Sequence, residues 1–579
     1  MDKINWNIIN SYFKTIRNNL VNHQIDSYNM FVMKQIPKVI RQFNPITSYY
    51  DDNQTRLDII IGATLDEKQN IVNDGKGIYI SKPVLNDYIK KKNDKGETII
   101  VNKLKQLYPN EARLKNLTYG VNIYLDIYIV YNDKKFKYIK NKNDEYQWVS
   151  LDEEEFKKTK PEKFNLGNIP VMLKSKLCVL NNLPKDVSFE MGECKYDQGG
   201  YFIIDGKEKV LISQERQTEN KIFIRKGREE DYYLFQSNIR SSPEDKFQPA
   251  RMTKLNILKE KINKKKVDNF KFYEQNYKNP NVALLYNEDD KVNNFIEEGT
   301  IRVIIPKIRL NNEFNHNIPL FILFRALGIT SDKNILQYIL GDLNNNKNER
   351  YLNILKHSVK DAQGIYTQKE AFLYLQKLLP PSIQNKNEKF CFIYILDILQ
   401  NHFIPHITDN LQIKAHYLGY MVREILDCYL GISDTTDKDN YIYKRVDLSG
   451  FLVGTIFRDL YFRYRNNIEH TVNKEYARLK EFQKENVEEE ADISINTLIN
   501  KNNLSLIFSS EWINDGFKFA FKNAWGLKGA PGNKLGIVQD LNRLSFLGTV
   551  SHLRRLNNPL PKGSKIRKPH SLHGSSWGI

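Results

Sequence analysis

Arginine, lysine and carboxamide side chains crowd into residues 534–568, near the end of the chain. Arginine suits phosphate because its planar guanidinium donates two parallel hydrogen bonds, and glutamine or asparagine can bond sugar hydroxyls or base edges. Prolines and glycines punctuate the segment, which predicts a basic loop beside a helix end. Such a segment could grip a nucleic-acid backbone, but a disordered basic tail has the same composition. The residues are Lys534, Gln539, Asn542, Arg543, Arg554, Arg555, Lys562, Lys565, Arg567 and Lys568.

Motifs of a self-contained active site are missing from the sequence. It has no GxxxxGK[ST] phosphate loop, no GxSxG nucleophile elbow, no HExxH zinc motif and no EF-hand loop. The acidic pairs at 51–52 and 289–290 lie in segments rich in Asn and Asp, where carboxylates are usually solvated. His570 and His573, with His552 upstream, lack further ligands at zinc spacing. We therefore predict no catalytic residue and no metal site in this chain.

The bulk composition is that of a large, basic, folded protein. Lys and Arg number 87 against 69 Asp and Glu, a formal net charge of +18 over 579 residues. That length suggests roughly three to five domains. The charge favours a polyanionic partner, nucleic acid before anionic membrane. An AT-rich genome, such as that of a large DNA virus or a protist, would also enrich the chain in Lys, Asn and Ile.

The cysteines and the apolar segments indicate the compartment. None of the four cysteines forms a CxxC pair, so we predict small buried hydrophobic residues in a reducing compartment. They are Cys178, Cys194, Cys391 and Cys428. The N-terminus lacks a signal-peptide pattern, and the best apolar stretch, 318–324, stops at Arg325. We expect a cytosolic, nuclear or virion-packaged protein that is neither secreted nor bound to a membrane.

Local patterns predict the elements that must position the basic segment. Residues 201–212 have a β-hairpin pattern around Asp205-Gly206, a pair that tolerates a tight primed turn. Residues 408–430 have helical periodicity, with Thr408 or Asp409 as the expected N-cap and Gly431 as the expected end. Residues 451–484 also look mostly helical. A glycine-rich loop at 526–536, a short helix and a Pro/Gly/Lys-rich end follow.

Seven sequence blocks occur in an order typical of one enzyme family. They are 165–176 (IPxMLxS), 197–216 (GGYFIINGxEKVLIxQE), 324–329 (FRALG), 414–421, 444–450, 553–557 and 573–578. Together they resemble the second-largest subunit of the multisubunit DNA-directed RNA polymerases of cells and large viruses. The resemblance covers residues 160–579, and the first 160 residues match more weakly.

The resemblance implies an α+β multidomain fold, the N-terminal half of that subunit. Residues 1–217 and 445–522 would form the protrusion, 218–444 the lobe, and 523–579 an incomplete fork with loops near 523–537 and 557–568. The protrusion and lobe would form one wall of the DNA cleft. By the same resemblance, candidate contacts to the RNA–DNA hybrid or template strand are Gln539, Asn542, Arg543, Arg554 and Arg555. Candidate contacts at the bubble edge are Lys562, Lys565, Arg567 and Lys568.

The family's chain continues beyond the point where this sequence stops, into its hybrid-binding region, wall and clamp segment. We therefore expect the isolated chain to be inactive. A split gene, an intein or intron, or truncated sequence data would explain why the sequence stops early. Expected partners are the largest subunit, the C-terminal half of the second-largest subunit, other subunits, template DNA and nascent RNA. No cofactor is expected on this chain, since Mg²⁺ in the assembled enzyme would be held by the largest subunit. The expected location is the nucleus, or a virion or viral factory. The alternative is a non-enzymatic, basic nucleic-acid-binding protein that retains the fold.

Overall fold

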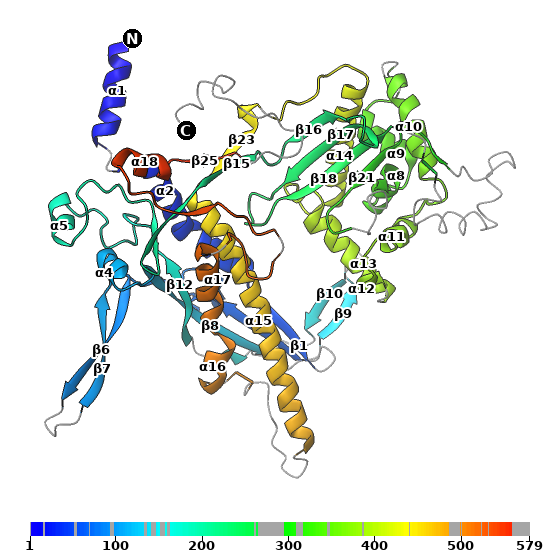
Figure 1. Ribbon diagram of the computed structural model, residues 1–579. Helices are drawn as coiled ribbons and strands as arrows, with labels where there is room; N and C mark the ends of the chain where they lie inside the picture. The colour runs from blue at the N-terminus through cyan, green and yellow to red at the C-terminus, as the bar shows by residue number, and fades with distance from the viewer. Residues whose placement is uncertain are drawn as a thin grey trace. The chain divides into compact units, whose positions relative to one another are not determined.

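The chain folds into two compact units in a computed structural model (Figure 1). Unit 1 comprises residues 1–216 and 446–579, and unit 2 comprises residues 217–445. The structure describes residues 2–15, 18–50, 55–68, 70–92, 98–132, 136–140, 146–150, 157–158, 162–259, 262–263, 295–308, 317–343, 345, 348–384, 387–438, 440–485, 498–499, 501–522, 524–530 and 532–558. Within unit 1, an ion pair of 2.7 Å between Arg216 Nε and Asp447 Oδ1 joins the two segments where the chain leaves and returns.

Unit 1 is built around an antiparallel sheet whose central strand is β8. Its strands are β1 (Ile46–Tyr50), β2 (Thr55–Ile61), β5 (Ile78–Ile80), β8 (Gly120–Asn132), β11 (Lys157–Lys158) and β12 (Glu162–Pro170). Strand β2 pairs Ile59 with Ile129 and Ile61 with Ile127, while β12 pairs Phe164 with Leu125. These side chains are buried, so the sheet contributes one face to a hydrophobic core. Smaller hairpins are β3 (Thr64–Leu65) with β4 (Ile71–Val72), β6 (Val84–Lys92) with β7 (Thr98–Gln106), and β9 (Phe136–Lys140) with β10 (Tyr146–Ser150).

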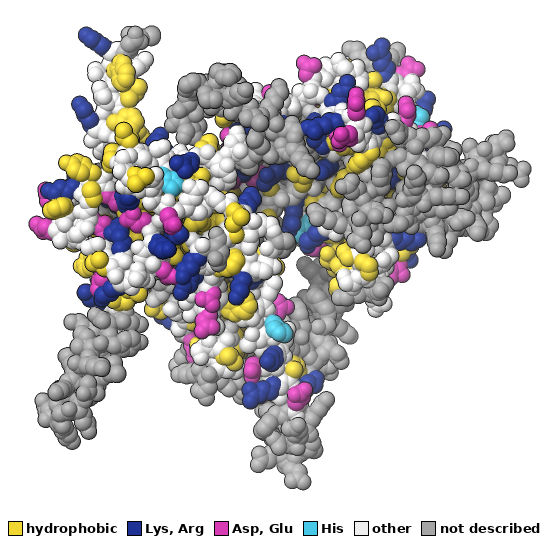
Figure 2. Space-filling view, in the orientation of Figure 1, with side chains coloured by type: hydrophobic (Ala, Val, Ile, Leu, Met, Phe, Trp, Pro, Cys, Tyr) yellow, Lys and Arg dark blue, Asp and Glu magenta, His cyan; other side chains and the backbone are white. Residues whose placement is uncertain are grey.

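Unit 1 also contains helices, and several of them pack against this sheet and against one another. They include α2 (Asn22–Met30), η1 (Phe31–Gln35), α3 (Ile36–Gln42), α4 (Pro109–Leu114), α5 (Lys185–Glu190), α15 (Ser449–Glu485), α16 (Lys501–Ile507), α17 (Glu511–Lys522) and α18 (Phe546–Leu553). The long helix α15 confirms the prediction for 451–484. Helix α17 packs closely on β12, where a Cβ on Gly167 would lie 2.9 Å from the Ile513 Cβ. Helix α1 (Asp2–Thr15) instead exposes apolar side chains (Figure 2). Trp6, for example, is 63% exposed.

The predicted hairpin at 201–212 is confirmed. Strand β13 (Phe202–Ile204) pairs antiparallel with β14 (Lys207–Leu211), and Phe202 lies opposite Lys209. Asp205 and Gly206 both have positive φ angles, 45° and 77°, as a primed two-residue turn requires. The Asp-Gly pair is therefore the local cause of this hairpin.

Unit 2 combines a second antiparallel sheet with a set of helices. The strand order is β16 (Ile222–Lys226), β17 (Tyr233–Ser241), β18 (Arg251–Leu258), β21 (Ile301–Ile304) and β22 (Ile318–Pro319). A short pair is formed by β19 (Ile262–Asn263) and β20 (Phe295–Ile296). The helices include α8 (Leu320–Ala326), α9 (Asp332–Leu340), α10 (Glu349–Asp361), α11 (Gln368–Gln376), α12 (Pro381–Gln384), α13 (Glu388–Asp397), η6 (Ile398–His402), α14 (Leu411–Tyr429) and η7 (Tyr441–Tyr443).

The core of unit 2 lies between this sheet and the helices. Its buried cluster includes Leu255, Ile257 and Val303 from the strands and every apolar residue of α8. The apolar stretch at 318–324 therefore forms the end of a sheet and a core helix. A bidentate ion pair is buried beside the core, with Arg302 Nη2 2.8 Å from Asp361 Oδ1. None of the described helices is long and apolar enough to span a membrane.

Two details of the predictions were wrong. Helix α14 is capped by the side chain of Asn410, which accepts a hydrogen bond from Gln412 N, and not by Thr408 or Asp409. Its predicted end at Gly431 is confirmed, with φ at 73°. Cys194 is exposed although we predicted it to be buried, because it lies in the turn-rich segment after α5 and not on an apolar face. The other three cysteines are buried, and all four are free thiols.

Candidate nucleic-acid interface

The 202–211 hairpin carries the segment in which most of the predicted contacts lie. Strand β24 (Val538–Asp540) adds to β14 as a third antiparallel strand and pairs Gln539 with Val210. The ammonium of Lys209 lies 2.6 Å from Asp540 Oδ1, and Leu541 N donates to Glu208 O. After helix α18, strand β25 (Leu556–Asn557) runs parallel to β15 (Ser213–Gln217). Both ends of residues 538–557 are therefore held by strand pairing, the first end to β14 and the second end to β15.

His552 links Gln539 to Asn542 from inside this segment. The residue is 5% exposed, its Nδ1 accepts a hydrogen bond from Asn542 N, and its Nε2 lies 2.9 Å from Gln539 Oε1. Because Nδ1 is an acceptor, the ring proton of the neutral imidazole is on Nε2 and is donated to Gln539. Burial, followed by the positive charge of Arg555, lowers the pKa of His552.

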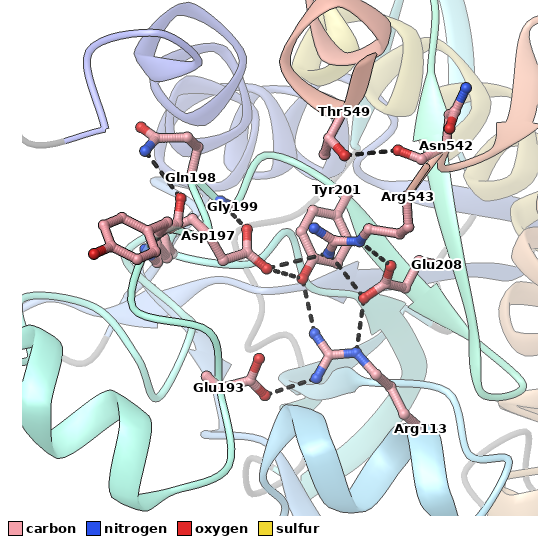
Figure 3. A network of polar contacts seen from close by, with 12 residues as sticks. Arg113, Glu193, Asp197, Gln198, Gly199, Tyr201, Glu208, Asn542, Arg543 and Thr549 are labelled. Carbon is pink, nitrogen blue, oxygen red and sulfur yellow. Dashed lines mark hydrogen bonds and ion pairs between the residues drawn. The ribbon is translucent and has the colours of Figure 1, made fainter. Parts of the chain in front are cut away.

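Exposed polar groups remain at Asn542 and Arg555. Asn542 Oδ1 accepts from Leu544 N, while its amide points away from the surrounding network (Figure 3). Arg555 follows the end of α18, and its Nη1 lies 3.5 Å from Gln539 Oε1 at the limit of a hydrogen bond. Gln539 Nε2 donates to Gly536 O. The Gln539 amide is therefore oriented by the protein, whereas Arg555 can donate to an outside acceptor.

Arg543 is the best-anchored side chain of the segment. Its Nε donates to Glu208 Oε2 at 2.7 Å, and its Nη2 donates to Glu208 Oε1 at 3.0 Å and to Asp197 Oδ2 at 3.2 Å (Figure 3). Its guanidinium also lies over the ring of the buried Tyr201, 4.9 Å from the ring centroid. Burial alone would raise the pKa of Asp197, but the positive charge of Arg543 and the hydroxyl of Tyr201 lower it.

Arg113, at the end of α4, binds Glu208 from the opposite side. Its Nε donates to Glu208 Oε1, its Nη1 to Glu193 Oε1 and its Nη2 to the Tyr201 hydroxyl, at 2.7–2.8 Å. The Tyr201 hydroxyl lies 2.5 Å from Asp197 Oδ2. Two arginines and three carboxylates thus surround one buried tyrosine (Figure 3).

Arg554 points into the protein. Its Nη1 donates to Leu20 O at 2.7 Å, and its side chain is half-buried. Nearby, the buried amide of Gln24 donates to Ser213 Oγ and Leu553 O and accepts from the backbone N–H and the hydroxyl of Ser449. The end of α18 is therefore bound to the segment that leads into α2.

A profile of known sequences matches most of this chain. The family described as RNA polymerase beta subunit matches residues 19–502. The chain belongs to this family. DNA-directed RNA polymerase II subunit 2 of Arabidopsis thaliana is 30% identical over 580 residues, which cover 99% of this chain and 41% of the relative. DNA-directed RNA polymerase II subunit RPB2 of Schizosaccharomyces pombe is 29% identical over 583 residues (99% and 40%).

A more distant relative belongs to the same family. DNA-directed RNA polymerase subunit Rpo2 of Saccharolobus shibatae is 24% identical over 579 residues, which cover 99% of this chain and 39% of the relative. The chain therefore spans about two fifths of the length of these family members. Its resemblance to the second-largest subunit, inferred from seven short blocks, is confirmed by these matches.

The predicted contact residues fall into two groups in this member of the family. The structure brings Gln539, Asn542, Arg543, Arg554 and Arg555 together on one β24–α18–β25 segment. The other four, Lys562, Lys565, Arg567 and Lys568, lie outside the described residues, as do the acidic pairs at 51–52 and 289–290 and His570 and His573. Lys534 is described, and its backbone pairs with Trp525 in the glycine-rich loop.

Sequence reasoning missed the residues that orient the candidate contact residues through hydrogen bonds and ion pairs. His552 was considered only as a zinc ligand, yet it orients Gln539 and Asn542. Glu208 and Asp197 lie more than 330 positions from Arg543 in the chain, so local patterns carry no signal for their pairing. A glutamate between two lysines, Lys207 and Lys209, in the hairpin strand was the available hint. On the face of unit 1 in Figure 2, described Lys and Arg side chains lie among Asp and Glu.

Proposed function

We propose that this chain is the N-terminal part of the second-largest subunit of a DNA-directed RNA polymerase and contacts the RNA–DNA hybrid during template-directed RNA synthesis. The observation that carries the proposal is the family match along residues 19–502, together with relatives that align with 99% of the chain. Partners would be the largest subunit, the rest of the second-largest subunit, template DNA and nascent RNA. A nuclear location belongs to the same proposal, since two of the relatives above are RNA polymerase II subunits of eukaryotes.

The finer architecture is also part of the proposal. Unit 2 would be the lobe, residues 1–217 and 445–522 the protrusion, and residues 523–579 the fork. Support comes from the observed chain crossings at 216/217 and 445/446, each one residue from the expected boundary. Further support comes from the fork segment, because 538–557 packs on the protrusion hairpin within unit 1.

The interface would be formed by the exposed side of the fork segment. Asn542 and Arg555 are the described side chains best placed to bond sugar and phosphate, and Gln539 would support Arg555. Lys562, Lys565, Arg567 and Lys568 remain predicted contacts at the bubble edge. No three His, Cys, Asp or Glu side chains lie close enough to hold a metal ion in the described part of the chain. On the family resemblance alone, the proposal assigns Mg²⁺ to the largest subunit of the assembled enzyme.

Purification of the tagged chain from its native source tests the proposal. We expect mass spectrometry to identify a largest subunit and the remainder of the second-largest subunit in stoichiometric amounts. We also expect the purified complex to extend RNA on a hybrid scaffold. Recovery of nucleic acid without any polymerase subunit would overturn the proposal and favour a non-enzymatic nucleic-acid-binding protein with this fold.

A further inference from the structure

The guanidinium of Arg543 is already engaged on three sides by the protein. Two of its nitrogens bond both oxygens of Glu208, one of them also bonds Asp197, and Tyr201 covers one face of the plane (Figure 3). Such a fork-to-carboxylate arrangement uses the geometry that would otherwise recognise a phosphate. A phosphate at Arg543 would therefore have to displace a bidentate carboxylate.

The charge of Arg543 is already balanced by neighbouring groups. Glu193, Asp197 and Glu208 supply three negative charges, and Arg113, Arg543 and Lys174, which lies close to Asp197, supply three positive charges. Asp197 and Glu193 are 7% and 6% exposed at their side chains, so their charges are poorly screened by water. A phosphate brought to Arg543 would have to compete with carboxylates that already neutralise its charge.

The position of Arg543 in the chain gives it a mechanical role. It lies between β24 and α18, directly after Asn542, whose carbonyl accepts from the Thr549 hydroxyl of α18. Leu541 N donates to Glu208 O, so Glu208 is bound through both its backbone and its side chain. His552 lies in the last turn of α18, and Arg555 follows the end of this helix.

We propose that Arg543 is a positioning residue that clasps the fork segment onto the hairpin, so that Asn542 and Arg555 meet the nucleic acid and Arg543 does not. This inference rests on the proposed function for its binding readout. The attachment of the fork segment to the hairpin by Arg543, called the clasp below, does not depend on any ligand. Hybrid binding and the clasp are therefore tested in separate experiments.

The dependence of hybrid affinity on salt distinguishes a clasp from a contact. Each phosphate contact adds about 0.9 to the slope of log affinity against log salt concentration. In the complete polymerase, Arg555→Met should reduce that slope by about one. Arg543→Met should weaken binding by about fivefold, as for the loss of one structural contact, with an unchanged slope. A slope reduced by about one in Arg543→Met would overturn the inference.

Hydrogen exchange of the same complex, without nucleic acid, tests the clasp directly. Arg543→Met should speed exchange of the amides of Leu541 and Thr549, while Lys207→Met, which removes an exposed positive charge from the same hairpin, should not. Arg543→Lys should restore part of the protection, because lysine keeps the charge but not the fork. Unchanged protection in Arg543→Met would refute the clasp even if hybrid binding proves unmeasurable. Absence of hybrid binding by the unaltered complex would refute the proposed function alone.

Discussion

His552 has both ring nitrogens occupied, one by a backbone N–H and one by an amide oxygen. Protonation of Nδ1 would remove the acceptor for Asn542 N, and the lowered pKa means that the unfolded chain takes up the proton first. The stabilisation is therefore complete above the ordinary pKa of 6.5 and is lost as the pH falls below it. We expect the exchange protection of the Asn542 amide to drop as the pH falls below 6.5. His470→Asn, at an exposed site on α15, should leave this profile unchanged, and a flat wild-type profile would contradict the account.

Gln24 satisfies several buried groups from different parts of unit 1. Its amide bonds Ser213, Leu553 and Ser449, and its side chain is almost fully buried. Gln24→Leu would leave three buried groups without this partner: the Ser449 N–H and the hydroxyls of Ser449 and Ser213. Each such loss costs about 1–3 kcal/mol of stability. We expect the free energy of opening at the Ser449 amide, measured by hydrogen exchange, to fall by at least about 3 kcal/mol. Met30→Ala, at an exposed site at the end of the same helix, should change it by less than about 0.5 kcal/mol.

At the scale of elements, the sequence predicted those whose cause is local. The Asp205-Gly206 turn and the helix end at Gly431 need only the residues that form them. The N-cap of α14 was assigned to the wrong residue because three cap formers, Thr408 to Asn410, stand in a row and only packing selects one. The clasp on Arg543 depends on partners more than 330 residues away, so no local pattern could predict it.

Helices α9 and α14 pack closely at Gly419, which belongs to the sequence block 414–421. A Cβ on Gly419 would lie 2.3 Å from Tyr338 O, a backbone atom that cannot rotate away. Gly419→Ala should therefore destabilise unit 2 by about 1–3 kcal/mol from overpacking, less the gain of about 1 kcal/mol in helix propensity. Hydrogen exchange within α9 measures the effect. Tyr420→Ala, at the next and exposed position, should cost less than about 0.5 kcal/mol. A stabilised Gly419→Ala variant would show that the helices can separate freely.

At the scale of the whole molecule, the chain divides its stability between two cores. The buried cluster of unit 2 draws its residues from 224–428, while Gln24 and the Arg543 clasp belong to unit 1. The chain crosses between the units at 216/217 and 445/446. A substitution that destabilises one core should therefore lower the free energy of opening of its own unit only. Separate cooperative units of a structure open with separate free energies.

The buried pair of Arg302 and Asp361 provides the test of that separation. Their side chains are 3% and 1% exposed, so Asp361→Leu leaves a buried guanidinium charge without its carboxylate, at about 3–5 kcal/mol. We expect exchange protection to fall in β17, β18 and α10 and to persist in β8 and α15. The Gln24→Leu variant should show the reverse pattern. Loss of protection in both units from either change would mean that they unfold as one, and the lobe assignment would then lose its main structural support.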